Sequence, residues 1–416
     1  EACHKRGMKF IQHLTCTDQI HEMATARYVE QHPDQACVDM RTNRPLFSDY
    51  KTYATCLNNP EFWSAFMMRL EELIKGVPLD GIMLDEVAFW GDYTCGCKVC
   101  REKFRNETGC DLPTGLKSDD KAFIRNLDNP TYVKWLRWRK NCITSRNLEV
   151  RALIKKIRPE GDFYQTYLCE PSVAGMWNPY YTGGYQLDSQ MDYSDSIGYE
   201  CEPISFNHFY GWPAILPNMK WQKAVNDRIN ADPWLYFYPT QYGDITWMWI
   251  LGLTMGNSNF WFPDEENPEE LVERARTPIM QWTAKYHELL GNTTPLADTA
   301  LVFSLNTRDL CSEGIAWRCG YIGTCQAFTD AHLPCKILTD RDLTDDNTLA
   351  GLKTLVLFNT VCLSDNALAA ITNFVSKGGS LIASGSVSLR NENGRLRENF
   401  GLTELFGFSY KQRIQS

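Results

Sequence analysis

The chain has 416 residues, which is long for one ordinary domain and indicates two. Its formal net charge is −9 and it contains no run of Lys or Arg, which argues against nucleic acid or an anionic membrane surface as a partner. No apolar stretch of about 18 residues occurs, so we expect no membrane-spanning helix.

The first residues predict the end of a helix, a stop at Gly7 and then a strand over Met8–Leu14. No initiator Met and no signal peptide precede this pattern. We therefore expect a fragment whose true N-terminus is missing, together with any localisation signal. The 16 cysteines do not suit a dense disulfide framework in a chain of this size, and they favour a reducing, cytoplasmic compartment.

Short apolar runs then alternate with long amphipathic segments. Helices are expected over Pro60–Lys75, with Asn59 as the N-cap, and over Tyr132–Ile157. This alternation predicts a parallel β/α fold, namely a (β/α)8 TIM barrel whose first two strands are missing; an open sheet is the alternative. The six expected strands are Met8–Leu14, Gly81–Glu86, Phe163–Leu168, Ser196–Glu200, Trp234–Tyr238 and Asn259–Pro263.

A second domain is expected after Thr294-Pro295. The barrel would cover residues 1–295, and a smaller flavodoxin-like α/β domain, cut short at Ser416, would cover residues 296–416. A helix over Leu368–Val375 would be closed by Gly378-Gly379. The four strands expected in this domain are Thr299–Ser304, Cys335–Leu338, Thr354–Phe358 and Ser380–Ala383.

Two carboxylates, Asp85 and Glu86, end one of the apolar barrel strands. The carboxyl ends of barrel strands surround the active site, so this pair is a candidate acid/base, although a helix cap or a salt bridge is the alternative. A second apolar run ends at Glu200, with Glu202 as its rival. Glycosidases need two such carboxyl groups on either side of the scissile bond.

Three cysteines, Cys95, Cys97 and Cys100, form a C-x-C-x2-C cluster soon after Glu86. Thiolates this close cannot comfortably pair as disulfides, but they can hold one tetrahedral Zn²⁺. Cys37 and Cys56 are the candidates for the fourth ligand. Four cysteines would make a closed, structural site, and the alternative is a set of free thiols.

Polar and aromatic residues near the expected strand ends are candidates for sugar binding. An aromatic face can stack on a sugar ring and a histidine can hydrogen-bond a hydroxyl, although packing in the core is the alternative for each. No P-loop, dinucleotide fingerprint, Gly-x-Ser-x-Gly elbow or His-Glu-x-x-His motif occurs. The candidates are His13, Trp90, Tyr210, Trp212 and Trp261.

The stretch from Leu84 to Phe104 resembles family 42 β-galactosidases, which have an Asn-Glu pair on the fourth barrel strand followed by a C-x-C-x2-C loop. The resemblance implies that Glu86 is the acid/base and that Cys56 is the fourth zinc ligand. Asp85 stands where that family has the Asn that contacts the sugar 2-hydroxyl.

The family places its nucleophile on the seventh strand, but Trp234–Tyr238 contains no Glu. The segment Glu200–Pro203 is more similar to family 42-like glycosidases with Glu-x-x-Pro after the sixth strand. The smaller domain resembles the β-galactosidase trimerisation domain, which has a class I amidotransferase-like fold, and this implies a homotrimer. This smaller domain lacks the Cys nucleophile elbow that an amidotransferase activity would need.

These observations together predict a glycoside hydrolase that acts on a terminal sugar of an oligosaccharide or glycan. Glu86 would be the acid/base and Glu200 the nucleophile of a retaining mechanism, with Asp85 among the substrate-binding residues. A carbohydrate-binding barrel that has lost hydrolysis is the main alternative, and a metalloenzyme that uses the cysteine cluster is another.

Overall fold

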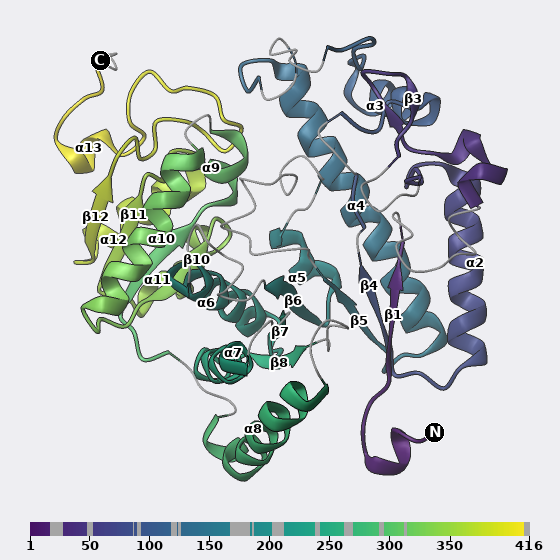
Figure 1. The fold of residues 1–416 in the computed structure, drawn as a ribbon. Coiled ribbons are helices and arrows are strands. Elements are labelled where there is room, and N and C mark those ends of the chain that lie inside the picture. The colour runs from purple at the N-terminus through teal and green to yellow at the C-terminus, as the bar shows by residue number, and fades with distance from the viewer. Residues whose placement is uncertain are drawn as a thin grey trace. The chain divides into compact units, whose positions relative to one another are not determined.

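The computed structural model describes residues 1–16, 28–47, 53–85, 87–89, 93–117, 123, 126–166, 184, 187–201, 212–237, 242–261, 269–290, 295–311 and 314–411 (Figure 1). Within these ranges the chain forms two compact units, the first ending at Gly198 and the second beginning at Tyr199. Over the same ranges, we find no helix with the length and apolarity that crossing a bilayer requires.

Three parallel strands and the first residues of a fourth form the sheet of the first unit, and each lies beside the next in the chain (Figure 1). Their register aligns Leu14, Leu84, Gln165 and Ile197 across the sheet. The carboxyl ends of these strands therefore lie along one edge. The strands are β1 (Ile11–Thr15), β4 (Gly81–Asp85), β5 (Asp162–Gln165) and β6 (Ser196–Cys201).

The first strand begins later than expected. A 3-10 turn, η1 (His4–Arg6), ends at Gly7 with a left-handed φ of 70°, as the sequence predicts. The next residues are extended but exposed, and the Phe10 backbone N–H donates to the Asp80 side chain at 2.6 Å. The strand ladder consequently starts at Ile11 instead of Met8.

Asparagine caps explain where the long helices of this unit begin. The Asn59 side chain accepts hydrogen bonds from the backbone of Glu61 (3.0 Å) and Phe62 (3.1 Å), which confirms the predicted cap of α2. Asn129 caps α4 in the same way, so that helix begins two residues before Tyr132. The helices of this unit are α2 (Pro60–Gly76), α3 (Lys98–Thr108), α4 (Pro130–Ile157), α5 (Gln190–Tyr193) and the 3-10 turns η2 (Pro33–Gln35) and η3 (Leu187–Ser189).

A short antiparallel pair, β2 (Val38–Asp39) with β3 (Arg44–Pro45), lies in the segment between β1 and β4. The sequence did not predict it, because two-residue strands have no periodicity to detect. In the larger sheet the strand order is β1-β4-β5-β6-β7-β8. This order follows the chain without reversal, as in a barrel, whereas a doubly wound open sheet reverses at a switch point.

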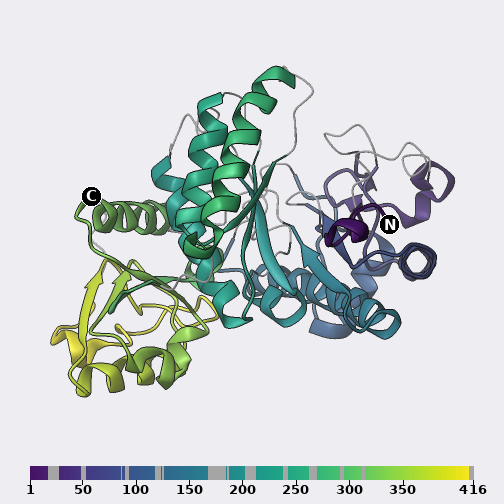
Figure 2. The same cartoon turned by 90° about the horizontal axis from the view of Figure 1, so that it is seen from below.

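In the second unit, β7 (Trp234–Phe237) pairs in parallel with β8 (Ser258–Trp261). A separate sheet of four parallel strands, drawn in green to yellow in Figure 2, also belongs to this unit. Its strand order is β10-β9-β11-β12. Its strands are β9 (Thr299–Phe303), β10 (Lys336–Thr339), β11 (Thr354–Phe358) and β12 (Ser380–Ser384), each close to its expected range. The helices of the unit are α6 (Trp212–Arg228), α7 (Tyr242–Thr254), α8 (Glu269–Leu290), α9 (Leu305–Leu310), α10 (Gly314–Asp330), α11 (Asp346–Ala350), α12 (Asp365–Ser376), α13 (Thr403–Phe406) and η4 (Asp342–Thr344).

Helices cover both faces of the four-stranded sheet. Alternate side chains of β9 and β11 pack with α12 in one apolar cluster, in which Ile371 is fully buried. On the opposite face, the Phe303 ring meets Trp317 and Tyr321 of α10, with ring centroids 5.2 and 5.0 Å apart. The central strands β9 and β11 are therefore buried between two helical layers, whereas the edge strand β12 is largely exposed.

Candidate active site and metal centre

Asp85 is the last residue of β4 and lies at the carboxyl edge of the sheet in the first unit. Its Oδ2 lies 3.0 Å from the Nε2 of His13 on the neighbouring strand β1. The Asp85 side chain is 10% exposed and the His13 side chain 47% exposed. The structure thus brings two of the sequence-derived site residues together, and His13 supports one face of a largely buried carboxylate.

The other carboxylate oxygen of Asp85, Oδ1, is buried and receives no hydrogen bond from the described part of the chain. Buried polar atoms are nearly always satisfied, and an unsatisfied one costs about 1–3 kcal/mol. A hydroxyl group of a ligand at this edge would remove that cost.

Two more polar residues at this edge were not identified from the sequence. Gln165 is fully buried at the end of β5; its Oε1 accepts from Tyr193 (2.5 Å) and Asn147 (3.2 Å), while its Nε2 has no partner among the described residues. The buried Oγ1 of Thr166 is likewise unpaired there. The expected strand continued to Leu168, whereas β5 ends at Gln165 and Thr166 follows it, so the sequence predicted both polar residues in the interior of a strand.

The remaining sequence-derived candidates divide into two groups. Glu200 lies in β6, Trp212 begins α6 and Trp261 ends β8, and for these three the structure describes the backbone alone. The others lie outside the described residues: Glu86, Trp90, Tyr210 and the rival carboxylate Glu202.

Four buried cysteines, Cys56, Cys95, Cys97 and Cys100, form a second site in the first unit. Their Sγ atoms all lie within 4.8 Å of one another, and Cys56 Sγ is 3.5 Å from both Cys97 Sγ and Cys100 Sγ. A tetrahedral zinc with bonds of about 2.3 Å would hold its sulfurs about 3.8 Å apart, so the four donors fit this metal. They would fill every position of a tetrahedral ion, so the arrangement suits a structural metal and gives no support to a metalloenzyme.

Local structure positions these thiols. Cys97 is the N-cap of α3, and its Sγ accepts from the Cys100 backbone N–H at 3.4 Å. Val38 N–H donates to Cys95 Sγ at 3.4 Å, and the Asn58 amide donates to Cys100 Sγ at 3.3 Å. Such N–H donors orient metal-bound thiolates and offset their negative charge.

The cluster also resolves the choice between the two candidates for the fourth ligand, because it contains Cys56 and not Cys37. Cys37 is buried beside it and shares a hydrogen bond with Cys95. Burial opposes ionisation of Cys95, but hydrogen bonds from the surrounding thiols, led by Cys100, hold the pKa of Cys95 well below its usual value. Burial raises the pKa of Cys100. The thiols therefore already favour one thiolate among them.

The chain matches no protein-family model and no curated protein. It does match solved structures. A cold-adapted β-galactosidase from Rahnella superimposes with a TM-score of 0.73 at 13% identity, covering 97% of this chain and 65% of that one. For a catalytic mutant of a family 42 β-galactosidase from G. stearothermophilus the TM-score is 0.70 at 12% identity, with coverages of 95% and 64%. An α-L-fucosidase from Paenibacillus thiaminolyticus gives 0.63 at 17% identity, with coverages of 96% and 55%.

These likenesses confirm, at the level of fold, the predicted resemblance to family 42 β-galactosidases and the (β/α)8-type architecture. Identities this low carry the fold alone, because one fold hosts many activities. The chain spans 55–65% of the length of these three proteins.

Proposed function

We propose that this chain is the catalytic part of a glycoside hydrolase that removes a terminal sugar from an oligosaccharide or glycan. The observation that carries the proposal is the carboxyl edge of the sheet. There one buried oxygen of Asp85, directly before Glu86, has no partner among the residues that the structure describes, while His13 binds the other. In a barrel of this type, a polar group held ready at a strand end belongs to the substrate site.

In the proposed mechanism Glu86 and Glu200 act as a pair. Glu86 donates its proton to the glycosidic oxygen as the bond to the anomeric carbon breaks, and the Glu200 carboxylate forms a covalent bond to that carbon. Glu86 then takes a proton from water, whose oxygen displaces Glu200 and releases the sugar. Retention requires the two carboxyl groups to lie about 5–5.5 Å apart.

Other residues would bind the sugar. Asp85 Oδ1 would accept a hydrogen bond from a ring hydroxyl, as the equivalent Asn does in the family that this chain resembles, and His13 would hold Asp85 in place. Gln165 Nε2 is a buried donor on the neighbouring strand and is available for a second hydroxyl. The proposed aromatic platforms are Trp90, Tyr210, Trp212 and Trp261.

We propose that the four-cysteine cluster holds a structural Zn²⁺. It would link the segment that ends at Cys56 with the segment that leads from Tyr93 into α3. When bound, the ion supplies rigidity to the segment that follows the β4 carboxylates, and no catalytic step passes through it.

We also propose that residues 1–295 form the barrel and residues 296–416 a class I amidotransferase-like trimerisation domain. The strand order β10-β9-β11-β12 supports this, since it equals the first four strands of the flavodoxin-type order 2-1-3-4-5. A homotrimer is the corresponding assembly, and sedimentation at several protein concentrations tests it.

The function is tested by hydrolysis of a panel of nitrophenyl glycosides by the wild-type chain, Glu86→Gln and Glu200→Gln. The control is Glu72→Gln, which changes an exposed carboxylate on α2. We expect one sugar to be cleaved, a loss of at least about 100-fold in each active-site variant, and no change in the control. If Glu86→Gln loses activity and Glu200→Gln does not, the nucleophile is a residue other than Glu200, and Glu202 is the next candidate. Sugar binding without cleavage of any glycoside would instead favour the degenerate, carbohydrate-binding barrel.

A further inference from the structure

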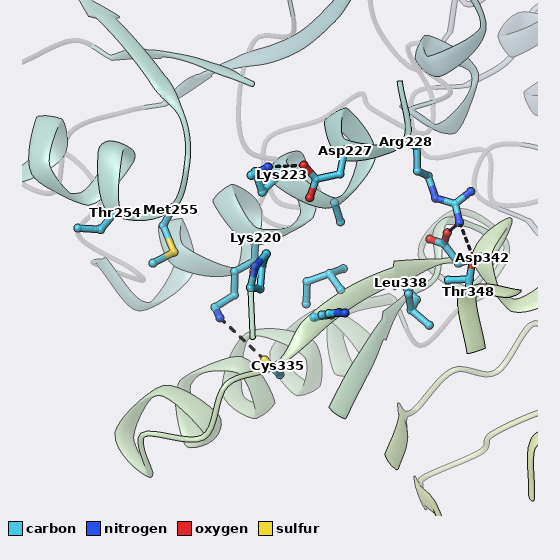
Figure 3. A pocket seen from close by; sticks show the side chains of 14 residues that line it. Lys220, Lys223, Asp227, Arg228, Thr254, Met255, Cys335, Leu338, Asp342 and Thr348 are labelled. Carbon is cyan, nitrogen blue, oxygen red and sulfur yellow. Dashed lines mark hydrogen bonds and ion pairs between the residues drawn. The ribbon is translucent and has the colours of Figure 1, made fainter. Parts of the chain in front are cut away.

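A cavity of about 470 Å³ lies in the second unit, between helix α6 and strand β10 (Figure 3). The side chains that α6 contributes follow a helical stripe, at Lys220, Lys223, Ala224, Asp227 and Arg228. Opposite them lie Cys335 and the first residues of β10, and Met255, directly after the end of α7, also lines the cavity. Proteins bind small molecules in cavities of about 300–1,000 Å³, so this volume is sufficient for a ligand.

Cationic side chains outnumber carboxylates around the cavity. Four cationic side chains and two carboxylates line it. Both carboxylates are already paired within the wall, Asp227 with Lys223 and Asp342 with Arg228 (Figure 3). The cavity therefore carries excess positive charge, although the whole chain has a net charge of −9.

The excess resides on Lys220 and Lys336. The ammonium group of Lys220 is partly buried, and its contact within the described ranges is with Cys335 Sγ at 4.0 Å, a weak acceptor (Figure 3). Lys336, the exposed first residue of β10, forms no ion pair with any carboxylate that the structure describes. Among the described residues neither ammonium group has a carboxylate partner, and the partly enclosed Lys220 attracts an anion most strongly, since its charge is screened less than in bulk water.

The rest of the wall sets the shape of the ligand. Met255, Ile337 and Leu338 provide apolar surface beside the charged groups. About 15 water molecules, at roughly 30 Å³ each, would fill the cavity, which is the space of a compact metabolite. We infer that this cavity is a binding site, separate from the proposed sugar site, for a small metabolite that carries a phosphate or carboxylate group, which Lys220 and Lys336 would bind.

Calorimetry in phosphate-free buffer tests the inference, using glucose 6-phosphate, inorganic phosphate and citrate as probes and neutral glucose as the control ligand. We expect saturable binding of at least one anion and none of glucose at this site. Glucose 6-phosphate or phosphate as the tighter probe would identify a phosphate ligand, and citrate a carboxylate ligand. Added NaCl should weaken the binding, because it screens the ammonium groups.

The variants Lys220→Gln and Lys336→Gln should each weaken anion binding by about tenfold, which is the loss of one charged hydrogen bond. Lys285→Gln, on exposed α8, is the matched control and should bind as the wild type does. The wild-type salt titration tests the proposal even where a variant fails to fold. The inference is overturned if no anion binds, if binding does not depend on salt, or if folded Lys220→Gln and Lys336→Gln proteins bind as tightly as the control.

Discussion

Replacing Asp85 by Leu should reduce catalysis and leave the protein as stable as before, or more stable. The side chain is largely buried, one of its oxygens has no partner within the described residues, and the other pairs with a half-exposed His13. Leu has a similar shape and no polar atoms. The substitution therefore removes an unsatisfied buried group together with one partly exposed hydrogen bond to His13.

The structure sets the size of each effect. Removing the oxygen that has no described partner recovers about 1–3 kcal/mol, whereas a hydrogen bond to the half-exposed His13 contributes about 1 kcal/mol or less. The free energy of unfolding should thus be unchanged or rise by about 1–2 kcal/mol. If Oδ1 binds a sugar hydroxyl, losing that charged hydrogen bond should lower kcat/KM by about 10- to 150-fold.

Asp39 provides the matched control, because it is a buried carboxylate with both oxygens in use. Its oxygens accept from the Arg41 backbone at 2.7 Å and from the Arg41 guanidinium at 2.5–3.1 Å. Burial alone would raise the pKa of Asp39, but these bonds lower it. Asp39→Leu should therefore destabilise the protein by about 1–3 kcal/mol.

Urea unfolding of both variants, beside kcat/KM on the glycoside that the wild type cleaves, measures the two effects. We expect opposite signs for the change in stability at Asp85 and Asp39, with the large loss of activity at Asp85. If Asp85→Leu is destabilised as much as Asp39→Leu, then the free oxygen has a structural role and is not reserved for substrate.

Three further predictions concern stability and metal. Gly320→Ala should lower the free energy of unfolding in urea by about 1–3 kcal/mol despite the higher helix propensity of Ala, because its Cβ would overlap the Phe358 ring. Adding Phe358→Leu should recover most of this loss. An unchanged urea midpoint for Gly320→Ala alone would contradict the close packing of Gly320 against Phe358. Purified protein should contain about one zinc per chain by elemental analysis. Cys97→Ser should lose the zinc and melt at a lower temperature, whereas the control Cys319→Ser, at an exposed thiol, should keep it. A metal-free wild-type protein would rule out the proposed zinc centre. Burial raises the pKa of Asp340 from 3.8 to about 6, so its contribution to stability is present below pH 3.8 and is lost as the pH rises through about 6. Unfolding titrations between these pH values should show this decline in the wild type and a flatter profile in Asp340→Asn, and parallel profiles would contradict the assignment.

The sequence by itself determined features that depend on residues close together in the chain. The stop at Gly7 and the cap at Asn59 depend on residues within one helical turn, and both were predicted at their observed positions. The C-x-C-x2-C spacing likewise brought three thiols together, because Cys97 caps the helix whose first turn contains Cys100. The alternation of strands and helices indicated the fold class for the same reason, since periodicity is read within one element.

Tertiary structure decided which distant residues meet. Spacing alone left Cys37 and Cys56 equal as candidates and only the family resemblance implied Cys56, whereas the folded chain places the Cys56 thiol with the other three. The contact of His13 with Asp85 depends on strand register, which no local pattern encodes. The end of β5 at Gln165 and the cation-lined cavity also arise from elements far apart in the chain. The sequence gives the chemistry of each side chain, but whether a charge or a hydrogen-bonding group lacks a partner depends on which side chains the fold brings next to it.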